Sequence, residues 1–192
     1  MTDSVKGMTS LQVKAEVLCY LRFQRQVPLV AVEFQHQDIV WVAQRRSAIV
    51  EVKVSIGDLK ADFKKDWHTG IRWALDPALH GAAEGCYWGS AVLHGRGSGY
   101  GQYEVWAPNQ FWFAVPDYIQ DSALKVIESL YPYAGLLACR AVGYSGGSTE
   151  VIRKPKELHT RRASKMFVAR LVKGQSASLA NAYTHRAKEG VR

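Results

Sequence analysis

The stretch Ala48-Ile-Val-Glu-Val-Lys-Val54 decides how the rest of the chain is interpreted. Its β-branched residues predict a buried strand, although the strand carries two charged side chains, Glu51 and Lys53. Because alternate residues of a strand point to opposite faces, we expect Glu51 and Lys53 to share one face and the valines to share the other. A buried charge is costly unless it is paired or binds a metal, so the two residues form either an ion pair or a functional site.

The segments around this strand predict one α/β domain. Helical spacing of apolar residues and β-rich runs between turn residues give the order α-β-β-β-α-β-α-β-β-α, which is typical of a mixed sheet with helices packed on it. Short connections predict hairpins between the first three strands. The expected helices cover residues 11–26, 56–75, 121–130 and 160–172, and the expected strands cover 29–34, 39–43, 48–54, 111–115, 135–141 and 149–153.

Residues 79–109 differ from the rest because they are rich in glycine and aromatic side chains without helical periodicity. We expect a β-hairpin insertion here, with strands over 87–93 and 100–106, that serves as an added contact surface or oligomer interface. Its histidines and cysteine lack the spacing of a zinc site, and its glycines do not fit a phosphate-binding loop.

Composition indicates an ordinary globular protein, because 47% of the 192 residues are hydrophobic and 22% are charged. No apolar run approaches the ~20 residues that span a bilayer. The first residues lack an apolar signal region, and the three cysteines are far apart with no CxxC. We therefore expect a reduced, cytoplasmic protein.

The charge is distributed unevenly along the chain. Residues 1–150 hold 14 basic and 15 acidic side chains (net −1), whereas residues 151–192 hold 11 basic and 2 acidic ones (net +9). Such a basic segment indicates either a polyanionic partner or a solubilising tail. The candidate phosphate contacts within it are Arg153, Lys154, Lys156, Arg161, Arg162, Lys165 and Arg170.

A second carboxylate is expected near the central strand. Asp38 begins the preceding strand and could pair laterally with Glu51. Two carboxylates and an amine at a sheet edge suit a hard divalent cation, with the Lys53 ammonium orienting water or stabilising developing charge. The alternative is a plain Glu51–Lys53 ion pair. Asp58 and Asp62, in the charged helical stretch that follows, are expected to form a solvated face.

Several motifs occur in the same order as in a known family. Glu16, Asp38, Glu51 and Lys53 follow the pattern of the PD-(D/E)xK nuclease superfamily, which this sequence resembles. Within that superfamily the chain is most similar to the MmcB-type DNA-repair proteins. The residues that carry this resemblance are Ile49-Val-Glu-Val-Lys53, Asp62-Phe-Lys-Lys65, Phe111-Trp-Phe-Ala-Val-Pro116, Gly135-Leu-Leu-Ala138 and Glu150-Val-Ile-Arg153, with Arg161-Arg162 beyond.

The resemblance implies a restriction-endonuclease-like mixed central sheet flanked by helices, in one domain over residues 8–172 with the 79–109 insertion. Residues 173–192 would form a basic C-terminal tail. It also implies a Mg²⁺ (or Mn²⁺) site made by Asp38, Glu51 and the carbonyl of Val52. Lys53 would be the catalytic amine, and Glu16 would be a further ligand through water, with Glu33 as its substitute. Lys60, Lys64 and Lys65 would contact phosphates, or else form a solvated face.

Three hypotheses for function follow. The first is a metal-dependent nuclease that hydrolyses DNA phosphodiester bonds in repair or processing. The second is a binding or recruitment module that keeps the nuclease fold with little or no catalysis, including a phage-encoded one. The third is an RNA-directed nuclease. DNA is the expected partner, a homodimer or a repair-complex protein is a further candidate, and no membrane partner is expected.

Overall fold

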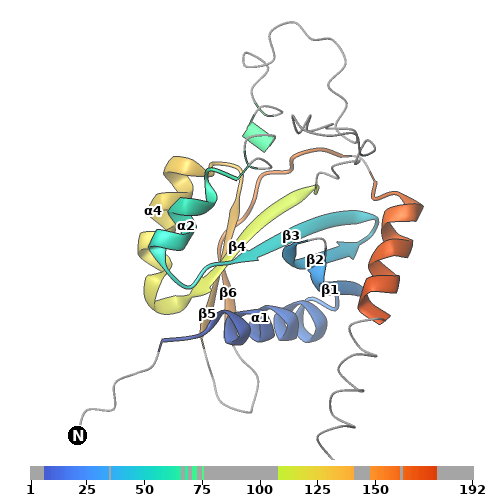
Figure 1. Ribbon diagram of the computed structural model, residues 1–192, viewed down its shortest axis with the longest axis horizontal. Helices are drawn as coiled ribbons and strands as arrows, with labels where there is room; N and C mark the ends of the chain where they lie inside the picture. Colours follow the sequence, from blue (N-terminus) through green and yellow to red (C-terminus); the bar gives the residue numbers. More distant parts are fainter. Residues whose placement is uncertain are drawn as a thin grey trace, which may run out of the picture.

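The computed structural model describes residues 7–34, 36–65, 68, 71–72, 75, 108–140, 148–160 and 162–176. Within these residues six strands form one mixed sheet with helices packed against it (Figure 1). The elements are α1 (Ser10–Cys19), the π-helix η1 (Tyr20–Gln24), β1 (Leu29–Phe34), β2 (Gln37–Ala43), β3 (Arg46–Val52), α2 (Ile56–Asp62), β4 (Gln110–Pro116), the 3-10 helix η3 (Asp117–Ile119), α4 (Gln120–Leu130), β5 (Gly135–Arg140), β6 (Ser148–Arg153) and a helix over residues 165–176.

The strands lie in the sheet in the same order as in the chain, β1 to β6. β1, β2 and β3 are antiparallel neighbours, β3, β4 and β5 are parallel, and β6 returns antiparallel to β5. Parallel neighbours need a crossover, and α4 occupies the one between β4 and β5. The sheet is therefore an α/β arrangement with a three-stranded meander on one side of a parallel centre.

Tight turns join the strands of the meander, as the short connections predict. Gln44 and Arg45, between β2 and β3, both have positive φ, 50° and 63°. Two left-handed residues in a hairpin turn match the right-handed twist of the flanking strands. His36, between β1 and β2, is also left-handed with φ of 67°.

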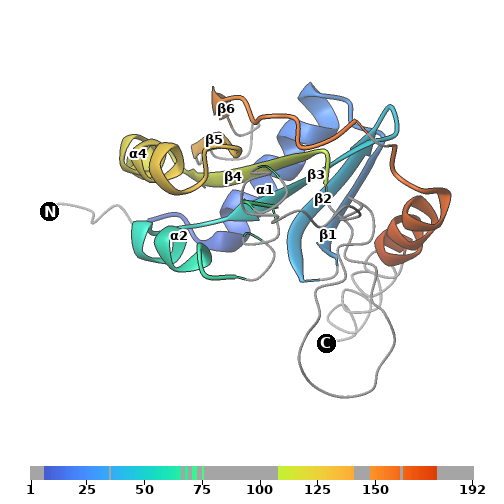
Figure 2. The same cartoon turned by 90° about the horizontal axis from the view of Figure 1, so that it is seen from above.

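Each face of the sheet buries its own apolar layer. On one face, Val13 and Val17 of α1 pack against Val50 and neighbouring strand residues. On the other face, α2 and α4 lie side by side over an aromatic cluster of Phe111, Phe113, Tyr131 and Tyr133 (Figures 1 and 2). β3 to β5 are thus covered on both faces, which explains why they are almost continuously hydrophobic.

The segment after β6 is fastened to the start of β3. The amide of buried Asn109 accepts from the Ser47 backbone N–H at 2.9 Å and donates to the His159 carbonyl at 2.7 Å. Arg46 forms an ion pair with Glu157. The helix over residues 165–176 then packs beside β1, where the Phe167 ring meets Phe34 edge to face at 5.9 Å (Figure 2).

The six strands predicted over 29–34, 39–43, 48–54, 111–115, 135–141 and 149–153 are confirmed, with ends shifted by up to two residues. The helix expected over 56–75 is interrupted, because α2 ends at Asp62 and residues 63–65 form a turn and a bend. The described residues beyond this break, 68, 71, 72 and 75, are again helical. The helix expected from residue 160 begins later, since the Ser164 hydroxyl caps it by accepting from the Phe167 N–H. The hairpin strands expected over 87–93 and 100–106 lie outside the described residues.

None of the helices in the described part of the chain is long and apolar enough to cross a membrane.

Ile127 tests the layer under α4, because its side chain is fully buried there. We expect Ile127→Ala to lower the free energy of unfolding by about 2–5 kcal/mol, the usual cost of a buried cavity of this size. The measurement is urea unfolding followed by circular dichroism. Ser129→Ala, an exposed change on the same helix, is expected to alter stability by less than about 0.5 kcal/mol.

Candidate functional site

Glu51 and Lys53 point to the same face of the sheet, as the alternation predicts. Ile49 lies in the layer under α2 and α4, whereas Val50 and Val52 lie in the layer under α1. The Lys53 N–H donates to the Ala114 carbonyl at 2.9 Å, so pairing with β4 continues past the end of β3. Both charged residues are buried, with exposed fractions of 3% and 5%.

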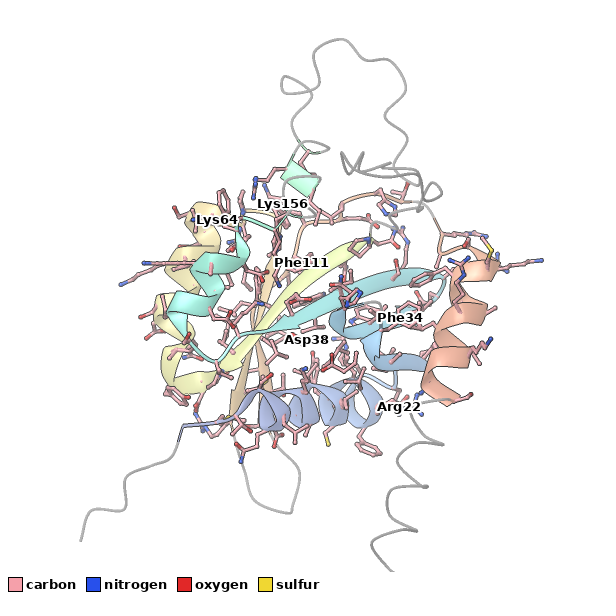
Figure 3. The ribbon with its side chains drawn as sticks, viewed as in Figure 1. Arg22, Phe34, Asp38, Lys64, Phe111 and Lys156 are labelled. Carbon is pink, nitrogen blue, oxygen red and sulfur yellow. The ribbon has the colours of Figure 1, made fainter. Side chains whose placement is uncertain are left out.

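Asp38 is fixed beside them at the start of β2. The β2–β3 register pairs Ile39 with Val50, so Asp38 comes opposite Glu51. Asp38 Oδ2 accepts from the Val52 N–H at 2.8 Å, and Oδ1 pairs with the Lys14 ammonium of α1 at 2.7 Å. Figure 3 shows Asp38 near the middle of the molecule. The structure thus brings together Asp38, Glu51 and Lys53.

Asp62 was predicted to lie on a solvated face, and that prediction is wrong. Asp62 is only 2% exposed and points from the end of α2 toward β3. The Lys53 ammonium lies between Asp62 Oδ1 at 2.8 Å and Glu51 Oε2 at 3.3 Å. The half-exposed Lys65 joins the same two carboxylates, at 2.5 Å from Asp62 Oδ1 and 3.7 Å from Glu51 Oε2. Asp58 is exposed, as expected.

The second oxygen of Asp62 leads to a fully buried histidine. Asp62 Oδ2 lies 2.7 Å from His68 Nε2, and the Tyr133 hydroxyl lies 2.7 Å from His68 Nδ1. The imidazole ring packs among aromatic rings, with centroids 5.0 Å from Phe111 and 5.0 Å from Tyr131. Aromatic packing and two hydrogen bonds fix the orientation of His68.

Burial and neighbouring charges shift the ionisation of this cluster in opposite directions. Burial raises the pKa of Glu51 to about 7; the Lys53 ammonium opposes this rise and the Asp38 carboxylate adds to it. Burial alone would also raise the pKa of Asp62, but hydrogen bonds from His68, Lys53 and Lys65 hold it well below its usual value. Burial lowers the pKa of His68 despite its contact with Asp62. Asp62 is therefore the firm anion of the cluster, and Glu51 the carboxylate that most needs a cation.

The remaining predicted carboxylates lie elsewhere. Glu16, on α1, faces the layer that contains Cys139; burial raises the pKa of the Cys139 thiol, and the Glu16 carboxylate adds to that effect. Glu33 is exposed, has a left-handed φ of 52°, and forms an ion pair with Lys14. Lys14 thus bridges Glu33 and Asp38.

Most of the predicted phosphate contacts are on the surface. Lys60 and Lys64 are exposed, and Figure 3 shows Lys64 and Lys156 on the same side of the view. Arg153 is half-buried and donates to the Pro132 carbonyl at 3.0 Å, so it also supports the fold. Arg161 lies outside the described residues. Lys154, Lys156, Arg162 and Lys165 are exposed.

Asp38 and Glu51 fit a hard divalent cation by their donor atoms. Asp38 Oδ1 already pairs with a cation, the Lys14 ammonium. The ion pairs of Glu51 with Lys53 and Lys65 both involve Oε2. Within the described residues no three His, Cys, Asp or Glu side chains are grouped closely enough to hold a metal. A two-carboxylate set completed by the Val52 carbonyl and water is nevertheless usual for Mg²⁺.

The sequence analysis missed the roles of Lys14, Asp62 and His68. A signal existed for Asp62, because it follows Leu59 by three positions and so shares the buried face of α2. No sequence pattern pointed to His68, whose contacts come from three separate segments. For Lys14 the only sequence signal was its position on the first helix, close to the buried Val13 and Val17.

Comparison with known proteins adds information on the fold alone. Neither a known protein family nor a curated protein matches this sequence. The solved structure of the SPO1766 protein of unknown function from Silicibacter pomeroyi is similar, with a TM-score of 0.54 and 16% identity over 97% of each chain. This chain therefore shares the overall fold of that protein across nearly its whole length.

The raised pKa of Glu51 predicts how stability depends on pH. The carboxyl binds a proton more readily in the folded state (pKa about 7) than at its ordinary value of 4.5, so stability is lost as pH rises through this window. We expect the unfolding free energy of wild type minus that of Glu51→Gln to fall by about 1–3 kcal/mol between about pH 5 and pH 8.

The measurement is urea unfolding at several pH values in a metal chelator. Glu128→Gln, an exposed change on α4, is the control and should give a difference that does not vary with pH. A flat difference for Glu51→Gln as well would mean that Glu51 is not strained by burial.

Proposed function

We propose that this chain is a metal-dependent nuclease that hydrolyses DNA phosphodiester bonds, built on a restriction-endonuclease-like form of the mixed sheet. The observation that carries the proposal is the meeting of Asp38, Glu51 and Lys53 on adjacent strands, with both members of the Glu-x-Lys pair buried. Buried charges on a central strand are costly, and a site for catalysis explains why they are kept there.

The residues divide the chemistry between them. Asp38, Glu51 and the Val52 carbonyl would hold Mg²⁺ or Mn²⁺, which supplies the Lewis acid that polarises a phosphoryl oxygen. Binding there requires Lys14 to leave Asp38 Oδ1, because two cations would otherwise compete for one oxygen. The Lys53 ammonium, beside Glu51, would stabilise negative charge on the phosphate in the transition state.

The basic residues would supply affinity for the DNA backbone. Lys156 is connected to the site through Tyr133, because its backbone N–H donates to the Tyr133 carbonyl at 2.9 Å and the Tyr133 hydroxyl meets His68. The exposed lysines and arginines after β6 offset the acidic site, which by itself would repel a polyanion. Attraction and cleavage would thus belong to different segments.

A second candidate is a DNA-binding or recruitment module without catalysis. It is favoured by the internal pairing of the site charges: Lys53 lies between Glu51 and Asp62, and both oxygens of Asp38 have partners. Such a network can be wholly structural. This candidate predicts DNA binding that needs neither metal nor Glu51.

Cleavage separates the two candidates. With plasmid and linear DNA in Mg²⁺ or Mn²⁺, we expect the wild type to cut and Glu51→Gln to be slower by about 10²-fold or more, because a buried ligand oxygen is lost. Glu128→Gln should cut at the wild-type rate. Equal and complete absence of cutting in wild type and Glu51→Gln, with DNA binding retained, would favour the module and exclude the nuclease.

Salt dependence tests the basic surface independently of catalysis. If about six phosphates are neutralised, the log–log slope of duplex affinity against salt should be near −5, and Lys154→Gln with Lys156→Gln should reduce its magnitude by about 2. Fluorescence anisotropy in a chelator measures this. Lys125→Gln, a change of an exposed lysine on α4 outside this segment, is the control and should leave the slope unaltered.

RNA of the same length, measured at equal salt, addresses the third hypothesis. If the salt slope of DNA affinity is the same in the Lys154→Gln and Lys156→Gln double variant as in the wild type, these lysines do not contact the DNA backbone.

A further inference from the structure

An ion pair and two hydrogen bonds connect the candidate catalytic amine to the aromatic layer. The Lys53 ammonium pairs with Asp62 Oδ1 at 2.8 Å, Asp62 Oδ2 meets His68 Nε2 at 2.7 Å, and His68 Nδ1 meets the Tyr133 hydroxyl at 2.7 Å. All four residues are buried. Asp62 lies closer to the ammonium than Glu51 does, at 2.8 Å against 3.3 Å.

The direction of these bonds follows from the donors available. Asp62, as an anion, only accepts, so His68 Nε2 carries the proton that it donates. With a neutral imidazole, His68 Nδ1 then accepts from the Tyr133 O–H. Burial lowers the pKa of His68 and raises that of Tyr133, which agrees with a neutral ring and a protonated phenol. Tyr133 therefore donates to His68, and His68 donates to the Asp62 carboxylate, where this series of hydrogen bonds ends.

This anion is held by rigid surroundings. The His68 ring is stacked on Phe113 with centroids 5.9 Å apart and meets Phe111 and Tyr131 at 5.0 Å each. The Tyr131 hydroxyl in turn donates to the Leu59 carbonyl of α2 at 2.6 Å. Asp62 is therefore held from two sides, by α2, which is joined to the aromatic layer, and by His68.

We propose that Asp62, oriented by His68 and Tyr133, is the positioning residue that holds the Lys53 ammonium in place beside Glu51. Asp62 does not touch the reacting atoms; it acts through Lys53. Its part in catalysis rests on the proposed nuclease function, whereas the holding of Lys53 does not. The half-exposed Lys65 covers the same anion from the solvent side.

The first test does not need catalysis. In protein labelled with ¹⁵N-lysine, the Lys53 ammonium protons should exchange slowly with water, because they are buried in ion pairs. In Asp62→Asn, which keeps the shape and removes the charge, we expect exchange about ten-fold faster, since a charge-assisted hydrogen bond becomes a neutral one. Asp121→Asn, the same change at an exposed residue of α4, should leave exchange unaltered.

The second test is kinetic. Asp62→Asn should lower kcat for DNA cleavage by about ten-fold or more while KM stays within about two-fold, because most of the proposed DNA contacts are on the segment after β6. Asp62→Glu, which restores the charge, should recover part of kcat. A purely structural role would instead lower the active fraction of both variants in proportion to their unfolding, measured by thermal denaturation.

Tyr133→Phe keeps the ring and loses only the hydroxyl, so it decides the matter if Asp62→Asn does not fold. It should speed Lys53 exchange by about two- to three-fold, a smaller change because it acts through His68. Unchanged Lys53 exchange in a folded variant at Asp62, or in Tyr133→Phe where that is the only folded variant, overturns the proposal. If Lys53 exchange is faster in the variants but the wild type does not cleave DNA, the positioning role of Asp62 is supported and the proposed nuclease activity is excluded.

Discussion

The burial of a charged pair in the central strand is the constraint on which the rest of this structure depends. Glu51 and Lys53 cannot lie under helices unless both charges are satisfied there. Glu51 alone gives the ammonium one partner, at 3.3 Å, for its three N–H donors. Asp62 supplies the second anion, which requires α2 to begin immediately after β3 and to end with its last residue over the strand. The aromatic layer beneath β4 and β5 then encloses the pair.

Much of the fold could be predicted from local patterns. Alternation in Ala48–Val54 gave the faces of β3, and turn residues gave the meander, because both depend on neighbours in the chain. The register that sets Asp38 opposite Glu51 was also foreseeable from a hairpin. The burial of Asp62 was signalled only by its position three residues after Leu59, and the charge of the surrounding helix outweighed that signal because a charged helix normally faces water.

The candidate site was predictable in its strands and unpredictable in its surroundings. His68, which contacts Asp62, meets Tyr133 across 65 positions of sequence, a contact that no periodicity encodes. Lys14 neutralises Asp38 from the opposite layer, so the side chains around this acid come from both sides of the sheet. The charged residues of the strand can thus be recognised from its own sequence, whereas the side chains that neutralise them come from distant segments.

The helix over residues 165–176 has a consequence for how the chain folds during its synthesis. Its Phe167 and Leu171 complete the layer over the β1–β2 hairpin, the part of that face in which Ala31, Val40 and Val42 are buried. Strands that are neighbours in sequence can pair as they emerge from the ribosome, but this apolar surface stays uncovered until residues 165–176 have also emerged. The first hairpin is therefore sheltered from water by a basic segment that is made much later than the hairpin itself.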